Sequence, residues 1–64
     1  MKAYIYNLQT RTIVTVVNAE SPELVDDLYN DTYNQYEQCE YDYTFDQDFA
    51  ETLNWPENLN IFDL

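Results

Sequence analysis

Almost every side chain in this sequence that could take part in chemistry is a carboxylate. The 64 residues contain 13 Asp and Glu but only two Lys and Arg, which gives a formal net charge of −11. The chain has no His and no Gly. It therefore lacks an imidazole that could act as a base or metal ligand, and it lacks the glycine-rich loop that holds a phosphate. We expect no catalytic activity and no cofactor.

Metal binding is the first use to consider for so many carboxylates. Asp42, Asp46 and Asp48, with Glu51 close behind, place oxygen ligands in a short span. A calcium-binding EF-hand loop requires Gly at its sixth position, however, and the chain has none. An acidic start of a helix explains this cluster more simply, so we expect no dedicated metal site.

The spacing of the acids predicts a regular array. Glu23, Asp27 and Asp31 repeat every four residues, about 6 Å apart on a helix. Glu40 and Asp42 would share one face of a strand, about 6.6 Å apart. Duplex DNA carries one charge per about 3.4 Å of axis on each strand, so rigidly held carboxylates at such spacings can imitate phosphates. The alternative is a solvated polar face, although ordinary surfaces mix both signs of charge. The predicted partner-binding residues are Glu23, Asp27, Asp31, Glu40, Asp42, Asp46, Asp48 and Glu51.

Three strands are predicted to position these acids. Residues 2–8 and 12–19 are rich in β-branched and aromatic side chains and flank a polar stretch at residues 9–11, which indicates a β-hairpin. Without Gly, its loop must be longer than a two-residue Asn-Gly turn. Residues 39–45 alternate between an apolar face of Cys, Tyr, Tyr and Phe and a face of Glu, Asp and Thr, as in a half-buried strand.

An amphipathic helix is predicted over residues 22–38. Ser21 suits its N-cap and Pro22 its first position. At 100° per residue, one side of the helix is apolar and includes Leu24 and Val25, whereas the acids gather on the other side.

A short second helix and a tail complete the chain. Thr44 and Gln47 have the spacing of a capping box, which predicts that this helix begins there. Residues 57–64 form either a last strand or an extension docked on the core through Leu59 and Phe62.

These elements predict one α+β domain over residues 1–64, in the order β-β-α-β-α. The hairpin and the third strand form a small antiparallel sheet, packed by the main amphipathic helix and the short second helix. The chain is 45% hydrophobic and 17% aromatic, so its charge does not imply disorder. At this length the core is thin.

Charge also limits where the protein acts and what it touches. The sequence has no apolar stretch long enough for a transmembrane helix and no signal peptide. Anionic lipid and nucleic acid would repel it, so we expect neither membrane binding nor direct nucleic-acid binding. Cys39 cannot form an internal disulfide and has little positive charge nearby, which favours an inert thiol in a cytoplasmic protein.

The oligomeric state depends on two opposing features. If both helices cover one face of the sheet, Tyr4 and Tyr6 would be exposed on the other face and would favour a symmetric dimer. Repulsion between two copies of so acidic a chain opposes this association, and on balance we expect a monomer.

The stretch from Tyr33 to Phe49 is rich in acidic and aromatic residues, and Asp48-Phe49-Ala50-Glu51 is followed by Pro56-Glu57-Asn58-Leu59. In these stretches, and in its length and charge, the chain resembles the small acidic inhibitors that phages and mobile elements direct against host defence. These are anti-CRISPR proteins and antirestriction proteins of the DNA-mimic type.

The resemblance implies a function in inhibition. Such a protein binds the basic nucleic-acid-binding surface of a CRISPR effector or restriction enzyme and blocks it by competition, in the host cytoplasm if it is phage-encoded. The main alternative is a generic acidic interaction module, either antitoxin-like or an assembly partner. A housekeeping domain from a salt-adapted organism is a third hypothesis.

Overall fold

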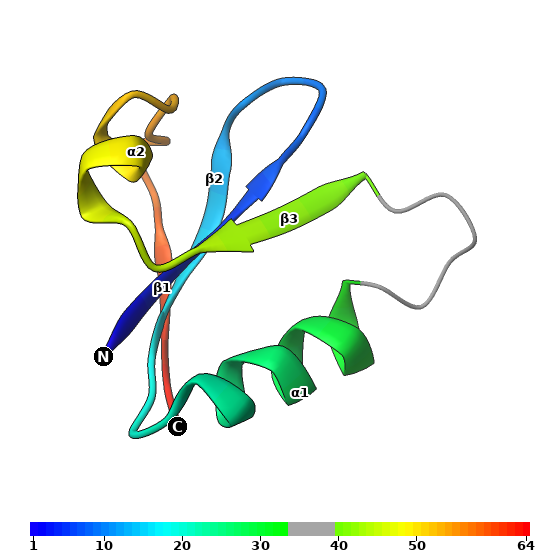
Figure 1. The fold of residues 1–64 in the computed structure, drawn as a ribbon. Coiled ribbons are helices and arrows are strands. Elements are labelled where there is room, and N and C mark those ends of the chain that lie inside the picture. Colours follow the sequence, from blue (N-terminus) through cyan, green and yellow to red (C-terminus); the bar gives the residue numbers. More distant parts are fainter. Residues whose placement is uncertain (34–39) are drawn as a thin grey trace.

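The computed structural model describes residues 1–33 and 40–64. The elements in this part of the chain are β1 (Lys2–Asn7), β2 (Ile13–Asn18), α1 (Pro22–Thr32), β3 (Tyr41–Thr44), α2 (Gln47–Glu51) and β4 (Asn60–Asp63) (Figure 1). The predicted α+β class and the order β-β-α-β-α are confirmed, and the tail adds a fourth strand.

β1 and β2 form the predicted hairpin. The strands pair antiparallel, with a shift of register between Ile5 and Tyr6. The loop is longer than a two-residue turn, as expected without Gly. Within it, the side-chain oxygen of Asn7 accepts two backbone N–H groups at 2.8 and 3.0 Å. Among the described residues only Arg11 has a positive φ, 58°, which reverses the chain at a position where Gly is more usual.

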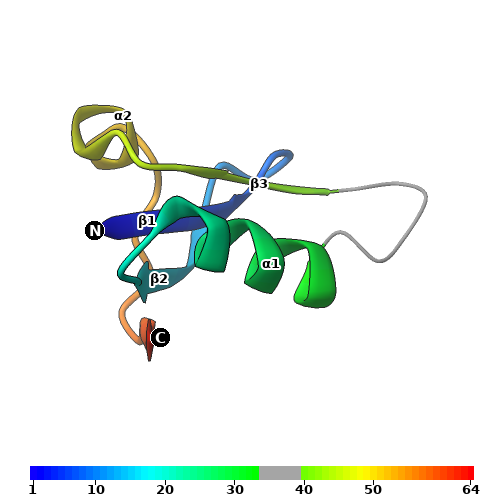
Figure 2. The same ribbon diagram turned by 60° about the horizontal axis from the view of Figure 1, so that its bottom comes forward.

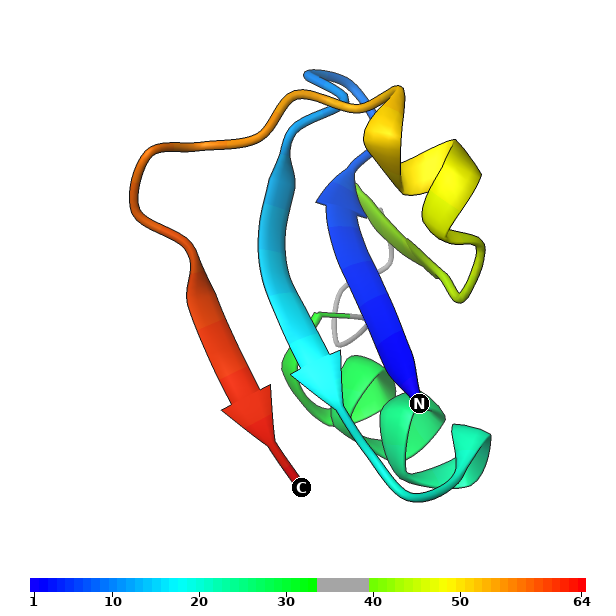
Figure 3. The same cartoon turned by 90° about the vertical axis from the view of Figure 1, so that its left-hand side faces the viewer.

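β3 and β4 complete a four-stranded sheet in the order β3-β1-β2-β4. β3 pairs antiparallel with β1, as predicted. β4 pairs parallel with β2, so the whole sheet is mixed. The chain after α2 crosses the hairpin end of the sheet, where Asn54 forms a bridge to Thr12 and donates from its side chain to the Thr10 carbonyl at 3.0 Å. β4 therefore starts beside the start of β2 and runs in the same direction (Figure 3).

The two helices cover opposite faces of the sheet (Figure 2). Successive side chains of a strand point to opposite faces, so Ala3 and Ile5 pack under α1 while Tyr4 and Tyr6 pack under α2. Tyr4 and Tyr6 are only 5% and 6% exposed, so they do not supply the apolar dimer surface considered above. The α1 cluster consists of Ala3, Ile5, Val17, Ala19, Val25 and Tyr29, and the α2 cluster of Tyr4, Tyr6, Ile13, Val16, Ala50 and Leu53.

α1 begins where the sequence predicts. Ser21 occupies the N-cap position and Pro22 the first turn, but the Ser21 side chain makes no capping hydrogen bond, so the expected side-chain cap is wrong. Val25 and Tyr29 are buried against the sheet. Leu24, on the predicted apolar side, is nevertheless 40% exposed, because it lies at the margin of the contact.

The far end of α1 is described as far as Thr32, with Tyr33 at its C-cap. The predicted continuation of the helix over residues 34–38 lies outside the described residues. Cys39, the predicted first residue of the third strand, lies outside them as well.

α2 is capped by Asp46. The Asp46 carboxylate accepts the backbone N–H groups of Asp48 and Phe49 at 3.0 and 3.4 Å. The predicted capping box of Thr44 and Gln47 is wrong, because Thr44 still belongs to β3. Its hydroxyl oxygen instead accepts the Asp46 N–H at 3.1 Å, at the turn that leads into the helix.

The tail docks on the α2 side of the sheet. Trp55 donates from its indole nitrogen to the Ala50 carbonyl at 3.0 Å and meets the Tyr4 ring edge-on at 5.8 Å. Leu59 packs against the α2 cluster, as predicted. Phe62 does not dock, since half of its surface is exposed.

Candidate partner-binding surface

The eight carboxylates of the predicted partner-binding set are all exposed. Within the described residues no carboxylate forms an ion pair with either basic side chain. The Arg11 guanidinium lies 5.7 Å above the centre of the Phe49 ring, a cation–π contact with an uncharged partner. The surface therefore presents its negative charge to solvent with little compensation.

Three of these acids form a row on α1, here named the α1 row: Glu23, Asp27 and Asp31. Glu23 and Asp27 point away from the sheet, because each lies about 160° around the helix from the buried Val25. Asp31 lies about 120° from Val25, on the side of the helix away from β3. With a rise of 1.5 Å per residue the row is about 12 Å long, and its carboxylates lie within about 80° of one another around the helix axis. None of the three accepts a hydrogen bond from a described residue.

The other acids form a second group near β3 and α2, here named the β3–α2 group: Glu40, Asp42, Asp46, Asp48 and Glu51. Several of these carboxylates already have structural partners. Asp46 caps α2, the Tyr6 hydroxyl lies 3.5 Å from Asp42 Oδ2, and Gln47 Nε2 lies 3.5 Å from a Glu51 carboxylate oxygen. This group is therefore less available to a partner than the α1 row.

The structure does not bring the predicted acids together as one continuous row. Because α1 and α2 cover opposite faces of the sheet, the α1 row and the β3–α2 group are separated by the sheet (Figure 2). A single flat partner surface can therefore contact one group fully, and reaches the other only around the β3 edge.

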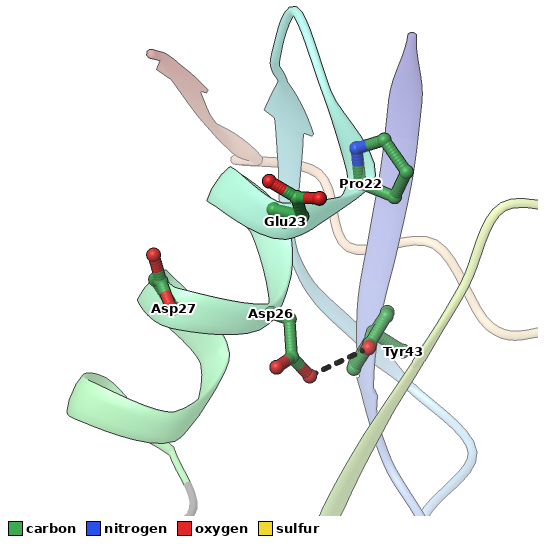
Figure 4. A pocket seen from close by; sticks show the side chains of 5 residues that line it. All are labelled: Pro22, Glu23, Asp26, Asp27 and Tyr43. Atoms are coloured by element: carbon green, nitrogen blue, oxygen red, sulfur yellow. Dashed lines mark hydrogen bonds between the residues drawn. The ribbon is translucent and has the colours of Figure 1, made fainter.

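A shallow hollow lies beside the α1 row, between α1 and β3. Pro22, Glu23, Asp26, Asp27 and Tyr43 line it (Figure 4). The Tyr43 hydroxyl donates to Asp26 Oδ1 at 2.9 Å. Two acids of the α1 row thus meet a third carboxylate and an aromatic ring in a concave site, which suits a cationic side chain.

Asp26 was missed by the reasoning from sequence. It is exposed and belongs to the polar side of α1, but it does not share the four-residue spacing of the α1 row. Its position about 100° from the buried Val25 turns it toward β3, where Tyr43 is its partner. The contact depends on the packing of α1 beside β3, which the helix periodicity alone does not show.

A network of aromatic rings holds α1 against β3. The Tyr29 ring lies 4.8 Å from that of Tyr43, and the Tyr33 ring lies 5.2 Å from that of Tyr41. The Tyr29 hydroxyl also donates to the Tyr41 carbonyl. Contacts of this kind stabilise beyond the apolar area that they bury. They fix α1 relative to β3 and therefore fix the shape of the hollow.

The surroundings of the hollow change the pKa of Tyr43. The hydrogen bond to Asp26, followed by burial and by the negative charges of Asp26 and Asp42, raises the pKa of Tyr43 above its usual value. Burial raises the pKa of Tyr6 and of Tyr33 as well, with the Asp42 carboxylate adding to the effect at Tyr6.

We expect the Tyr43→Phe variant to lose stability at neutral pH, by about 1 kcal/mol, since it loses a hydrogen bond to a charged acceptor at a partly exposed site. A raised folded-state pKa contributes stability that is present below the unfolded value of 10.0 and is lost as the pH rises through the folded value. Thermal melts at pH 8 and about pH 11 should therefore show the difference between wild type and variant shrinking at high pH. A difference that stays constant would contradict the contact with Asp26.

Comparison with protein families, with curated proteins and with solved structures gave no match to this chain. In the described residues, no group of three or more acidic or cysteine side chains is arranged to hold a metal ion. The helices of this part of the chain are too short and too polar to cross a membrane.

Proposed function

We propose that this protein binds a basic protein surface through the α1 row and the adjoining hollow, and that it blocks that surface for nucleic acid. The observation that carries the proposal is the exposed α1 row without compensating cations. The protein acts as a binding partner and not as an enzyme, without a cofactor or metal.

The chemistry of the α1 row favours Lys and Arg as its ligands. Three carboxylates spaced about 6 Å apart on a rigid helix offer successive sites for cationic side chains. An arginine that enters the hollow meets Glu23 and Asp27 as acceptors and the Tyr43 ring as a stacking surface. Such contacts between a charged row and a complementary surface speed association and select the partner.

A surface that accepts rows of phosphates is rich in Lys and Arg, which makes it the natural partner. Phosphate contacts dominate the affinity of such surfaces for nucleic acid. Carboxylates that occupy the same cations compete directly with the nucleic acid. CRISPR effectors and restriction enzymes present such surfaces in the host cytoplasm, and inhibition of one of them is the function that we propose.

The division of the acids between two faces favours a second candidate, a generic acidic interaction module. The α1 row alone is about 12 Å long, shorter than a long mimic of a DNA strand requires. An antitoxin-like or assembly partner needs only one such face. The two candidates differ in whether the partner's nucleic acid is displaced.

Capture from a lysate of host cells, followed by competition, tests the proposal. We expect the immobilised protein to retain a nucleic-acid-binding protein at low salt and to release it as NaCl rises above about 0.3 M, because screening weakens the charge contacts. Short duplex DNA should also release it, whereas an equal amount of a neutral polymer should not. Retention at high salt, or capture of the partner together with its nucleic acid, would contradict the mimic and favour the generic module.

A further inference from the structure

β4 leaves one edge of the sheet open. It has β2 on one side and no described strand on the other (Figure 3). The Leu64 N–H donates to the Asn18 carbonyl at 2.8 Å. Because backbone groups of a strand alternate in direction, Phe62 also turns its N–H and C=O toward β2, and Ile61 and Asp63 turn theirs outward. An open row of donors and acceptors is a template for another strand.

The side chains along this edge are mostly apolar. Ile61, Phe62 and Leu64 are 63%, 50% and 48% exposed, the densest run of exposed apolar residues along the described chain. Leu24 of α1 adds to it on the Phe62 side. It lies about 160° around the helix from Asp26, which bonds to β3, so Leu24 turns toward β4. Asp31 and Asp27 lie about 20° and 60° from Leu24 around the helix, so they border this side as well. Ile61 lies on the α2 face and Phe62 on the α1 face, so exposed apolar side chains flank this edge on both faces, as in an interaction surface.

The largest group of acids lies at the opposite edge of the sheet. β3 is the other edge strand, and the β3–α2 group lies beside it. β4 itself carries one carboxylate, Asp63, which accepts a hydrogen bond from the Asn18 side chain at 3.0 Å. β4 itself therefore adds little to the repulsion between copies, whereas Asp27 and Asp31 of α1 contribute to it.

We propose that β4 pairs antiparallel with β4 of a second copy of this chain across a two-fold axis, which joins two sheets into one of eight strands. The outward backbone groups select the register: Ile61 of each copy exchanges hydrogen bonds with Asp63 of the other. Phe62 then faces Phe62 across the axis, where side chains of an antiparallel pair come closest. No two carboxylates stand opposite each other in this register.

Self-pairing fits this edge better than a strand from a basic partner. A basic segment is drawn to the acids, which lie at the far edge and on α1. The β4 edge offers a basic segment one carboxylate, already hydrogen-bonded to Asn18. In the dimer the two β3–α2 groups lie at opposite ends of the joined sheet, so these two groups repel each other little. The inference does not depend on the proposed function.

Sedimentation equilibrium of the whole chain tests the proposal. We expect a reversible monomer–dimer equilibrium that shifts toward dimer between about 0.02 and 0.3 M NaCl, because salt screens the repulsion between copies. The Ile61→Pro variant removes an outward N–H and leaves the bonds to β2 intact, as is tolerated on an edge strand. It should keep the fold, checked by circular dichroism, and raise the dissociation constant of the dimer about tenfold or more.

A matched pair of substitutions separates this edge from a general effect of charge. Phe62→Lys should abolish the dimer, whereas Leu8→Lys in the hairpin loop should leave it intact. Leu8 is 46% exposed, close to Phe62 at 50%, and both variants add one positive charge. A wild-type chain that stays monomeric at about 1 mM in 0.3 M NaCl would overturn the proposal. So would a dimer that survives Ile61→Pro, or β4 binding an extended peptide of another protein without self-association.

Discussion

Replacing Glu23, Asp27 and Asp31 together by Lys should weaken binding to the basic partner about a hundredfold or more, because each position changes from attraction to repulsion. The fold should survive, since all three side chains are exposed and none accepts a hydrogen bond from a described residue. Binding kinetics measured at two salt concentrations check both points. A single reversal, such as Asp31→Lys, should mainly lower the on-rate.

Two matched triple variants serve as controls for net charge. In the first control, Lys replaces three acids of the β3–α2 group, namely Asp42, Asp48 and Glu51. In the second control, Lys replaces three acids outside the predicted set, namely Glu20, Glu57 and Asp63. Asp46 is left unchanged because it caps α2. Each triple changes the net charge by +6, from −11 to −5, so the three variants share the loss of long-range steering.

The loss of affinity in the three triple variants shows which surface binds the partner. We expect only the α1 triple to lose most of the affinity. Equal losses in all three would mean that net charge, and not a defined surface, governs binding. A greater loss in the β3–α2 triple would place the contact at that edge. Loss on truncating exposed aromatic residues, with little dependence on salt, would favour the generic module.

The Ile5→Ala variant should be largely unfolded at 25 °C in low salt. Ile5 is fully buried in the α1 cluster, and truncations of this kind cost about 3 kcal/mol. A core in a chain of this size supplies only about 3–5 kcal/mol of net stability. Repulsion among the exposed acids reduces it further. Raising NaCl to about 0.5 M should restore part of the folded population, because the screening length falls to a few Å.

Ile61→Ala is the matched control for this variant. It removes the same atoms from a side chain that is 63% exposed, and at low protein concentration it should change stability by less than about 0.5 kcal/mol. Melting curves followed by circular dichroism compare the two. If Ile5→Ala melts as wild type does, or if salt has no effect on either protein, the thin and charge-strained core is not the correct description.

Local patterns in the sequence were sufficient to predict most of the fold. The β-branched runs, the position of Pro22 and the alternation of residues 41–44 each depend on neighbours in the chain, and the hairpin, α1 and β3 all follow from them. The parallel pairing of β4 does not follow from any local pattern. It depends on how the chain crosses the hairpin end of the sheet near Asn54.

The sequence likewise predicts which acids of the candidate surface are exposed, but not how they are arranged relative to one another. Periodicity on α1 correctly places Glu23, Asp27 and Asp31 on the solvent side. A helical wheel relates residues only to their own helix, however, so it cannot say which face of the sheet α2 covers. The separation of the acids and the contact between Asp26 and Tyr43 both arise from that tertiary arrangement.

The order in which this chain folds follows from the position of β1 and β2 between two separate clusters. Both strands contribute residues to both clusters. The contacts within the hairpin are local, so it can form before either helix docks. α1 and α2 then add to opposite faces as independent steps. β4 pairs with β2 across 45 residues, from Thr15 to Asn60, so it can join the sheet only after the chain beyond α2 is in place. A nascent chain that has folded through α2 therefore still exposes the second edge of β2.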